Sequence, residues 1–228
     1  MKRPRKTVIN VGLLGLGTVG TGAMQILNNN RAEITAKTGS ELRITKALVR
    51  NLNKPRRQFD PNIELTVDAD QIIMDPNIDI IVEVMGGLEP ARKYITTALE
   101  HGKHVVTANK DLMALHGYEL FAIAQKHNRN IYYEASVGGG IPLIRPIKHC
   151  LAANKIKSIM GIINGTTNYI LTQMTAAKKD FQDALTEAQA RGFAEQDPTN
   201  DLEGRDAAYK LAILAGLAFQ SMVKVDQI

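Results

Sequence analysis

Apolar positions along the first 140 residues follow two alternating patterns. Short runs of β-branched and other apolar residues predict strands at 7–14, 43–50, 79–85, 104–108 and 130–135. Between several of these runs apolar residues recur at helical spacing, which predicts helices at 20–30, 90–101 and 111–128. Strands that alternate with helices of this length form parallel sheets covered on both faces, so we expect a doubly wound, Rossmann-like α/β domain over residues 1–140.

The pattern changes after a glycine-rich bend at 136–142. The sequence then predicts helices near 143–153, 167–178, 181–191 and 205–219, one strand at 155–163, and a polar loop at 192–203. We therefore expect a domain boundary near residue 140, followed over residues 141–228 by a smaller α+β domain.

The composition is that of a folded protein. Of the 228 residues 44% are hydrophobic and 22% charged, which excludes wholesale disorder. No apolar run approaches 18 residues, and the basic start is not followed by the apolar stretch of a signal peptide, so we expect no membrane association. Cys150 is the single cysteine, which excludes an internal disulfide and a zinc site of several thiolates. A reducing, cytoplasmic setting fits best.

The formal net charge is +5, with the excess concentrated at 2–6 and 50–57. Aromatic residues make up 5% of the chain and tryptophan is absent. Basic segments that bind nucleic acid usually alternate with stacking aromatic residues, so this composition argues against a nucleic-acid partner. Positive charge this local suits a small anionic ligand.

A glycine turn joins the first predicted strand to the first predicted helix. It reads Gly15-Leu16-Gly17-Thr18-Val19-Gly20, the spacing of dinucleotide-binding turns. In such turns the first glycine allows the tight bend, the second lets the pyrophosphate approach the backbone, and the third lets helix and strand pack closely. The alternative is a glycine-rich turn without a ligand.

Arg50 stands at the end of the second predicted strand, followed by Lys54, Arg56 and Arg57. An acidic residue at this position would bind a free ribose 2′-hydroxyl, whereas arginine can pair with a 2′-phosphate. We therefore expect NADP(H) to be preferred, with NAD(H) possible. The alternative is a solvated basic loop.

The last predicted helix carries Asp206 and Lys210 four residues apart, on one helical face. Such a pair is usually a surface ion pair worth about 0.3–0.5 kcal/mol. Two features favour a functional pair: the rest of the helix is strongly apolar, and the preceding carboxylates outnumber the lysine. These carboxylates are Glu195, Asp197 and Asp201.

Two long segments of the second half resemble signature segments of homoserine dehydrogenases. They are 161–171 (GIINGTTNYIL) and 194–210 (AEQDPTNDLEGRDAAYK), and the first half adds the glycine turn, 85–87 (MGG), 107–110 (TANK) and 134–142 (EASVGGGIP). The resemblance covers essentially the whole chain. It implies NAD(P)-dependent interconversion of L-homoserine and L-aspartate 4-semialdehyde, in the biosynthesis of threonine, methionine and isoleucine.

The resemblance also implies roles for individual residues. Lys210 would exchange the proton with the aldehyde oxygen, and Lys110 would contact cofactor and substrate at the nicotinamide end. Glu195 and Asp206 would bind the substrate's amino group and hydroxyl end, with Asp201 in the same acidic loop. A lysine, with an ordinary pKa of about 10.4, is protonated near neutrality, so oxidation is expected to accelerate into the alkaline range.

Further implied contacts have plain alternatives. Gly192 would contact the cofactor through its backbone, and it also suits the end of a helix. A monovalent cation, sodium, would be held by Glu134 and the carbonyls of Val137, Gly139 and Ile141, where a glycine hinge between domains is the alternative. Lys110 could equally be a lysine at a strand end that meets solvent. Family members are dimers, so a homodimer built on the second domain is expected.

Two other functions remain open at this point. Family members normally continue beyond this sequence, so the chain could be a fragment that binds cofactor without turnover. A cysteine-dependent semialdehyde dehydrogenase would need a nucleophilic thiol. Cys150 falls within a predicted helix, away from the acidic loop, and is expected to be buried or half-buried there.

Overall fold

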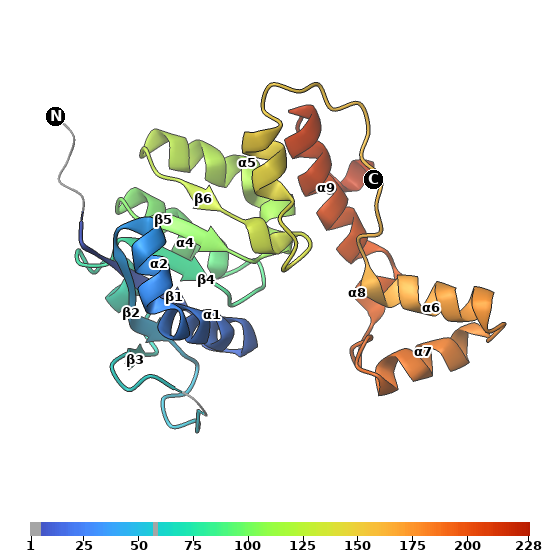
Figure 1. Ribbon diagram of the computed structural model, residues 1–228, viewed down its shortest axis with the longest axis horizontal. Coiled ribbons are helices and arrows are strands. Elements are labelled where there is room, and N and C mark those ends of the chain that lie inside the picture. The colour runs from blue at the N-terminus through green and yellow to red at the C-terminus, as the bar shows by residue number, and fades with distance from the viewer. Residues whose placement is uncertain (1–5, 57–58) are drawn as a thin grey trace. The chain divides into compact units, whose positions relative to one another are not determined.

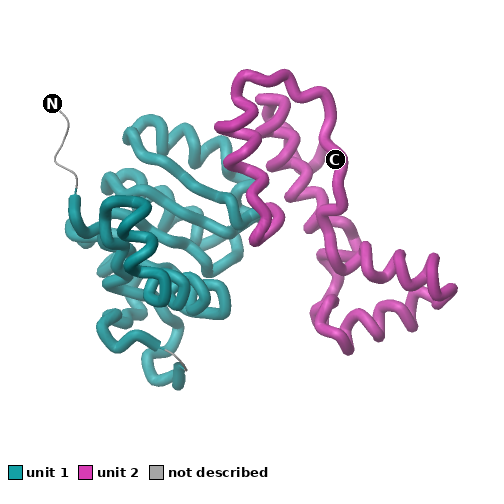
Figure 2. Tube along the Cα trace, in the orientation of Figure 1, with its two compact units in different colours: residues 1–136 teal, residues 137–228 magenta. Residues whose placement is uncertain are grey.

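The computed structural model describes residues 6–56 and 59–228. The described residues form two compact units that divide after Ser136 (Figure 2). Among the helices of these residues, none combines the length and the apolar character that a membrane span requires.

The first unit is built on six parallel strands in the order β3-β2-β1-β4-β5-β6. The strands are β1 (Val8–Leu14), β2 (Glu41–Leu48), β3 (Glu64–Thr66), β4 (Ile80–Glu83), β5 (His104–Thr107) and β6 (Ile131–Tyr132). This order reverses direction between β1 and β4, as in Rossmann folds, so the predicted doubly wound sheet is confirmed. In such sheets ligands bind beyond the carboxyl ends of the strands at this reversal.

Helices lie in the connections from β1 to β2, from β3 to β4, from β4 to β5 and from β5 to β6 (Figure 1). They are α1 (Thr18–Asn29), α2 (Arg31–Thr38), α3 (Asp70–Ile73), α4 (Ala91–Glu100) and α5 (Lys110–Lys126). The apolar side chains of β1, β2 and α1 form one buried cluster, which includes Val11, Leu13 and Met24. The strand at 43–50 begins and ends two residues earlier than predicted, while α2, α3 and β3 were not predicted.

The second unit, residues 137–228, is described throughout and is helical. Its helices are the π-helical turn η2 (Pro146–Cys150), α6 (Gly165–Ala176), α7 (Phe181–Ala190), α8 (Thr199–Leu202), α9 (Arg205–Phe219) and the 3-10 turn η3 (Val225–Gln227). Helices α6 and α7 pack through a buried cluster that contains Ile170, Leu185 and Ala188. The predicted helix at 205–219 is confirmed, and that near 143–153 is reduced to a single π-helical turn.

The predicted strand at 155–163 is wrong for this structure, because these residues have no regular secondary structure. A strand requires a neighbour that completes its hydrogen bonds, and no strand lies within residues 137–228. The segment instead exposes apolar side chains: Met160 is 94% exposed and Ile162 76%.

Candidate functional site

The glycine turn of the first unit lies between β1 and α1, and its three glycines differ in their surroundings. Gly15 has a φ of +105°, a conformation that side chains disfavour. A Cβ at Gly20 would lie 2.2 Å from the carbonyl oxygen of Gly15, so Gly20 permits the close packing of helix on strand. A Cβ at Gly17 would meet no described atom within 4 Å. The fold therefore explains Gly15 and Gly20, while the space beside Gly17 fits a ligand.

The start of α1 is open to an anion. Gly17 is the N-cap residue, and no side chain of the described residues caps the helix there. Thr18 and Val19 in the first turn are exposed, while Leu16 packs against the core cluster of the sheet. Backbone amides at such a helix start attract phosphate groups.

The arginines of the basic loop after β2 lie in different surroundings. Arg50 is exposed two residues beyond the strand. Arg56 instead folds onto its own loop, where its guanidinium donates to the carbonyls of Asn51 and Lys54 at 2.6 and 2.9 Å. Arg57 lies outside the described residues. Arg50, the predicted phosphate partner, and Lys54 are thus both at the surface.

A buried carboxylate organises the carboxyl ends of β4 and β5. Glu83 is fully buried, and its Oε1 accepts hydrogen bonds from the backbone amides of Met85 and Gly86 at 2.8 and 3.2 Å. Its Oε2 accepts from the hydroxyl of Thr107 at 2.6 Å. Asn109 links the same two loops, because its amide donates to the carbonyl of Gly87 at 2.6 Å.

Lys110 is the first residue of α5, directly after this network. Asn109 caps the helix by accepting from the amide of Leu112. The Lys110 ammonium lies 3.6 Å from a carboxylate oxygen of Asp111, and its side chain is 34% exposed. Lys110 is therefore partly exposed and has a charged neighbour. It lies at the edge of the sheet where ligands bind in this fold.

The second unit contains a cavity of about 610 Å³. Its walls come from α6 and the residue before it, the segment that follows α7, helix α8, and the first half of α9. The lining residues are Asn164, Gly165, Thr166, Asn168, Tyr169, Thr172, Gly192, Phe193, Asp201, Asp206 and Lys210. The charged side chains among them are two carboxylates and one lysine.

Asp206 and Lys210 are in contact, as their spacing predicts. The Lys210 ammonium donates to Oδ2 of Asp206 at 2.7 Å and to the carbonyl of Ile163 at 2.8 Å. The two side chains are only 10% and 19% exposed respectively. The alternative of a solvated surface pair is therefore wrong, since this pair lines a cavity.

Asp201 joins the pair through Asn164, which was not among the predicted site residues. The amide of Asn164 donates to Asp201 and to Asp206, both at 2.8 Å. The hydroxyl of Thr166, also not predicted, lies 2.8 Å from the other oxygen of Asp201. Asn164 precedes α6 and caps it, a role that its position before a helix does signal.

The remaining predicted residues of this loop lie differently. Gly192 lines the cavity and follows the end of α7 with a φ of +75°, so the helix-end role is confirmed. Glu195 is exposed and is not among the lining residues of this fully described unit. The structure thus brings Asp201, Asp206, Lys210 and Gly192 together, but not the carboxylate of Glu195.

An aromatic pair forms one wall of the cavity. The rings of Tyr169 and Phe193 are 4.8 Å apart, and the guanidinium of Arg191 lies 5.9 Å from the centre of the Tyr169 ring. Burial raises the pKa of the Tyr169 hydroxyl above its ordinary value.

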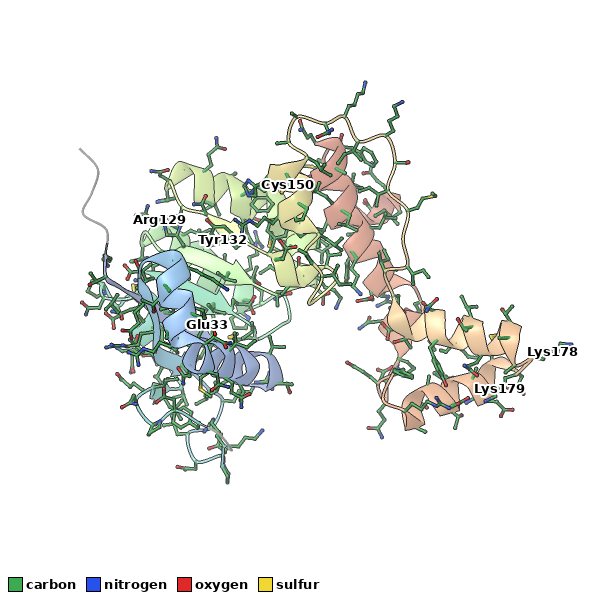
Figure 3. The ribbon with its side chains drawn as sticks, in the orientation of Figure 1. Glu33, Arg129, Tyr132, Cys150, Lys178 and Lys179 are labelled. Carbon is green, nitrogen blue, oxygen red and sulfur yellow. The ribbon has the colours of Figure 1, made fainter. Side chains whose placement is uncertain are left out.

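Cys150 corrects one expectation. It does lie in a helical turn, η2 (Figure 3), but its side chain is exposed instead of buried. A single π-helical turn with no buried residues does not cover its side chain. Cys150 is also absent from the lining of the cavity.

The predicted cation ligands lie along the glycine-rich segment. Glu134 belongs to the 3-10 turn η1 (Glu134–Ser136), Val137 is buried, and Ile141 is 59% exposed. The amide of Ile141 donates to the carbonyl of Gly138 at 2.8 Å, next to Gly139. No cluster of His, Cys, Asp and Glu among the described residues could hold a metal, and a site built on carbonyls stays a prediction.

Comparisons with known proteins agree along the chain. Residues 15–134 match the family model described as homoserine dehydrogenase, NAD binding domain, and residues 142–228 match the model described as homoserine dehydrogenase. A homoserine dehydrogenase of Bacillus subtilis is 47% identical over 220 residues, which are 96% of this chain and 51% of that protein. The chain thus spans about half the length of the curated relatives that it matches.

Solved structures give the same result. A homoserine dehydrogenase from Thiobacillus denitrificans superposes with a TM-score of 0.91 at 48% identity, covering 97% of this chain and 51% of that one. A hyperthermophilic archaeal homoserine dehydrogenase in complex with NADPH superposes with a TM-score of 0.75 at 27% identity, covering 94% and 71%.

Proposed function

The chain belongs to the homoserine dehydrogenase family, and we propose that it interconverts L-homoserine and L-aspartate 4-semialdehyde with a nicotinamide cofactor. Its first unit carries the family's cofactor-binding domain. The observation that carries the proposal is the contact of Lys210 with Asp206 in a cavity that also contains Asp201. A proton donor and surplus carboxylates are what an aldehyde with an ammonium group requires.

Lys210 is the proposed proton donor to the aldehyde oxygen. An ammonium carries three N–H groups, and two point to Asp206 and to the carbonyl of Ile163. The third can donate to a substrate oxygen. A nicotinamide cofactor, when bound, would supply the hydride for reduction, and Lys210 would supply the proton that completes the hydroxyl. In oxidation the neutral amine takes that proton back.

The substrate's ammonium is proposed to bind the carboxylates of the acidic loop. Asp201 and Asp206 line the cavity together with Lys210, so the lining carries one surplus negative charge. We keep Glu195 as a candidate for the same role. Lys110 is proposed to contact cofactor and substrate from the edge of the sheet, as the family resemblance implies.

The cofactor fits the glycine turn. The space beside Gly17 and the open start of α1 would receive the pyrophosphate. The exposed Arg50 supports a preference for NADP(H), because its guanidinium can pair with a 2′-phosphate. Gly192 is proposed to add a backbone contact.

Three further features belong to this proposal. We propose a homodimer, supported by the exposed apolar side chains of segment 155–163. Light scattering that gave only the monomer mass would contradict it. We also propose a sodium ion at the carbonyls beside Glu134, and a cytoplasmic location. The sodium ion rests on the family resemblance, and the location rests on the single cysteine, Cys150.

The proposed activity is tested by L-homoserine oxidation with NADP⁺ and with NAD⁺, in parallel with the Lys210→Ala variant. Turnover that the variant loses would support both the reaction and the proton donor. NADPH binding without turnover would favour the alternative of an inactive, cofactor-binding chain. A cysteine-dependent reaction is not favoured, since Cys150 lies outside the cavity lining.

A further inference from the structure

All hydrogen-bonding positions of the Asn164 side chain are occupied within the cavity of the second unit. It is 8% exposed. Its oxygen accepts from the amide and from the hydroxyl of Thr167, both at 2.8 Å. Its nitrogen donates to Asp201 Oδ1 and to Asp206 Oδ2, both also at 2.8 Å. Two acceptor and two donor positions are all that an asparagine side chain has, so its orientation is fixed by its partners.

This arrangement holds two carboxylates beside each other. Both oxygens lie 2.8 Å from one nitrogen, so they are at most twice that distance apart. A hydroxyl has one proton and could serve only one of them. A cationic side chain would cancel the negative charge that a substrate ammonium needs. A primary amide supplies two donors without charge, which meets both requirements.

The neighbouring contacts make the arrangement rigid. The hydroxyl of Thr166, in the first turn of α6, lies 2.8 Å from Asp201 Oδ2 and 2.8 Å from the carbonyl oxygen of Phe193, so these two acceptors share its single proton. Both oxygens of Asp201 therefore face the start of that helix. Oδ2 of Asp206 accepts hydrogen bonds from both the Asn164 amide and the Lys210 ammonium. The position of the Lys210 ammonium is therefore coupled to Asn164 through one shared oxygen atom.

We propose that Asn164 is a positioning residue that sets the spacing of Asp201 and Asp206 and, through Asp206, the place of the Lys210 ammonium. This inference deepens the proposed homoserine dehydrogenase function and rests on it. The ligand class that the arrangement selects is a small substrate with an ammonium group near a carbonyl or hydroxyl, since the cavity offers paired carboxylates beside one proton donor.

Two substitutions separate this role from helix capping. Asn164→Ser and Asn164→Asp each keep an oxygen that can cap α6, but both lose the two N–H donors. Asn164→Asp also adds a third negative charge. The matched control is Asp180→Ser, which changes the exposed cap of the neighbouring helix α7 and touches neither carboxylate. Each variant of the whole protein is assayed for L-homoserine oxidation, for NADPH binding and for thermal stability.

For Asn164→Ser we expect kcat/KM for L-homoserine to fall about 10- to 100-fold, the usual effect of losing hydrogen bonds to charged groups. NADPH affinity should change less than about twofold, because the glycine turn is untouched. In Asn164→Asp the rise of the oxidation rate should also move to higher pH, since a third carboxylate favours the protonated form of Lys210. Asp180→Ser should change neither quantity. Unchanged kcat/KM in Asn164→Ser, or an equal loss in the control, would overturn the proposal.

A second readout does not depend on turnover. In the folded Asn164→Asp protein the introduced carboxylate would join Asp201 and Asp206 opposite one lysine, so the folded state retains protons that the unfolded state has released. The free energy of unfolding should then fall more steeply from acidic to neutral pH than in Asn164→Ser. If the unfolding free energies of the two variants change with pH in the same way, the proposed contacts of Asn164 are refuted, whether or not the protein oxidises homoserine. A wild-type protein that does not oxidise homoserine would refute only the proposed function.

A milder variant covers the case in which neither substitution folds. Thr166→Val removes one hydroxyl beside Asp201 and leaves Asn164 in place. We expect KM for L-homoserine to rise about threefold to tenfold, in line with a single hydrogen bond. Because Asn164 still contacts both carboxylates in this variant, a fall in kcat/KM well beyond tenfold, as large as the loss in Asn164→Ser, would show that Thr166 and not Asn164 positions Asp201, which would overturn the proposal.

Discussion

The glycine turn allows fold and ligand binding to be tested separately, because Gly17 and Gly20 predict opposite outcomes. An alanine Cβ at Gly17 would meet no described atom within 4 Å, and the φ of −88° suits alanine. Replacing glycine at a compatible position usually stabilises a protein by about 0.4–1 kcal/mol. The same methyl group would occupy the space that we assign to the pyrophosphate. We therefore expect Gly17→Ala to be at least as stable as the wild type but to bind NADPH at least about tenfold more weakly, or about 1.4 kcal/mol.

Gly20→Ala, in contrast, should mainly lower the stability of the fold. Its Cβ would lie 2.2 Å from the Gly15 carbonyl oxygen and 3.3 Å from a methyl group of Val84. Forcing a methyl group into a packed site costs about 1–3 kcal/mol, against which alanine gains up to about 1 kcal/mol of helix propensity. A net loss of about 1–2 kcal/mol lowers the melting temperature by about 2–8 °C in a chain of this size.

The assay is thermal unfolding without cofactor, together with fluorescence titration of NADPH, for both variants and the wild type. NADPH binding by Gly17→Ala with wild-type affinity would refute the assignment of the pyrophosphate to this turn. A Gly20→Ala protein as stable as the wild type would show that helix and strand separate at little cost. That result would contradict the packing argument but not the binding argument.

Three further predictions use other parts of the molecule. Lys210→Ala should lower kcat for homoserine oxidation about 10²- to 10⁴-fold, the usual contribution of an acid–base group, with NADPH titration unchanged. Arg50→Ala should weaken NADPH binding more than NADH binding, by about tenfold if the guanidinium pairs with the 2′-phosphate; equal effects on both cofactors would contradict that role. Burial lowers the pKa of Lys103, whose ammonium donates to the carbonyl of Ile78 at 2.8 Å. The unfolded chain then binds more protons between that lowered pKa and the ordinary value of 10.5, so the free energy of unfolding should rise with pH across this window relative to Lys103→Met. Parallel urea-unfolding curves against pH would contradict it.

Long elements with a clear period could be predicted from the sequence. The strands at 79–85 and 104–108 and the helix at 205–219 appear close to their expected bounds. Strand β3 and helix α3 have only three and four residues, too few to show a period, and both were missed.

The segment 155–163 shows a different limit. Its apolar positions predict a strand, but the structure leaves Met160 and Ile162 exposed, and residues 137–228, all of them described, contain no strand that could pair with the segment. Hydrophobic pattern indicates which residues favour burial, but it does not supply the neighbour that a strand needs. The same limit applies to Cys150, whose predicted burial depended on a longer helix than the turn that forms.

Within the candidate site, some contacts could be predicted from local spacing and others could not. Asp206 and Lys210 are four residues apart on one helix, so local spacing predicts their contact, and the structure confirms it at 2.7 Å. Asn164 meets Asp201 and Asp206 across 37 and 42 residues. No local period carries that information, and only the fold brings these side chains together.

The most direct test of the central claim is the stoichiometry of reduction. The protein is mixed with NADPH and L-aspartate 4-semialdehyde, and both the NADPH consumed and the L-homoserine formed are measured, with Lys210→Ala alongside. The account predicts one homoserine for each NADPH oxidised, and little of either product in the variant. Binding of NADPH without homoserine formation, or equal turnover by Lys210→Ala, would contradict it.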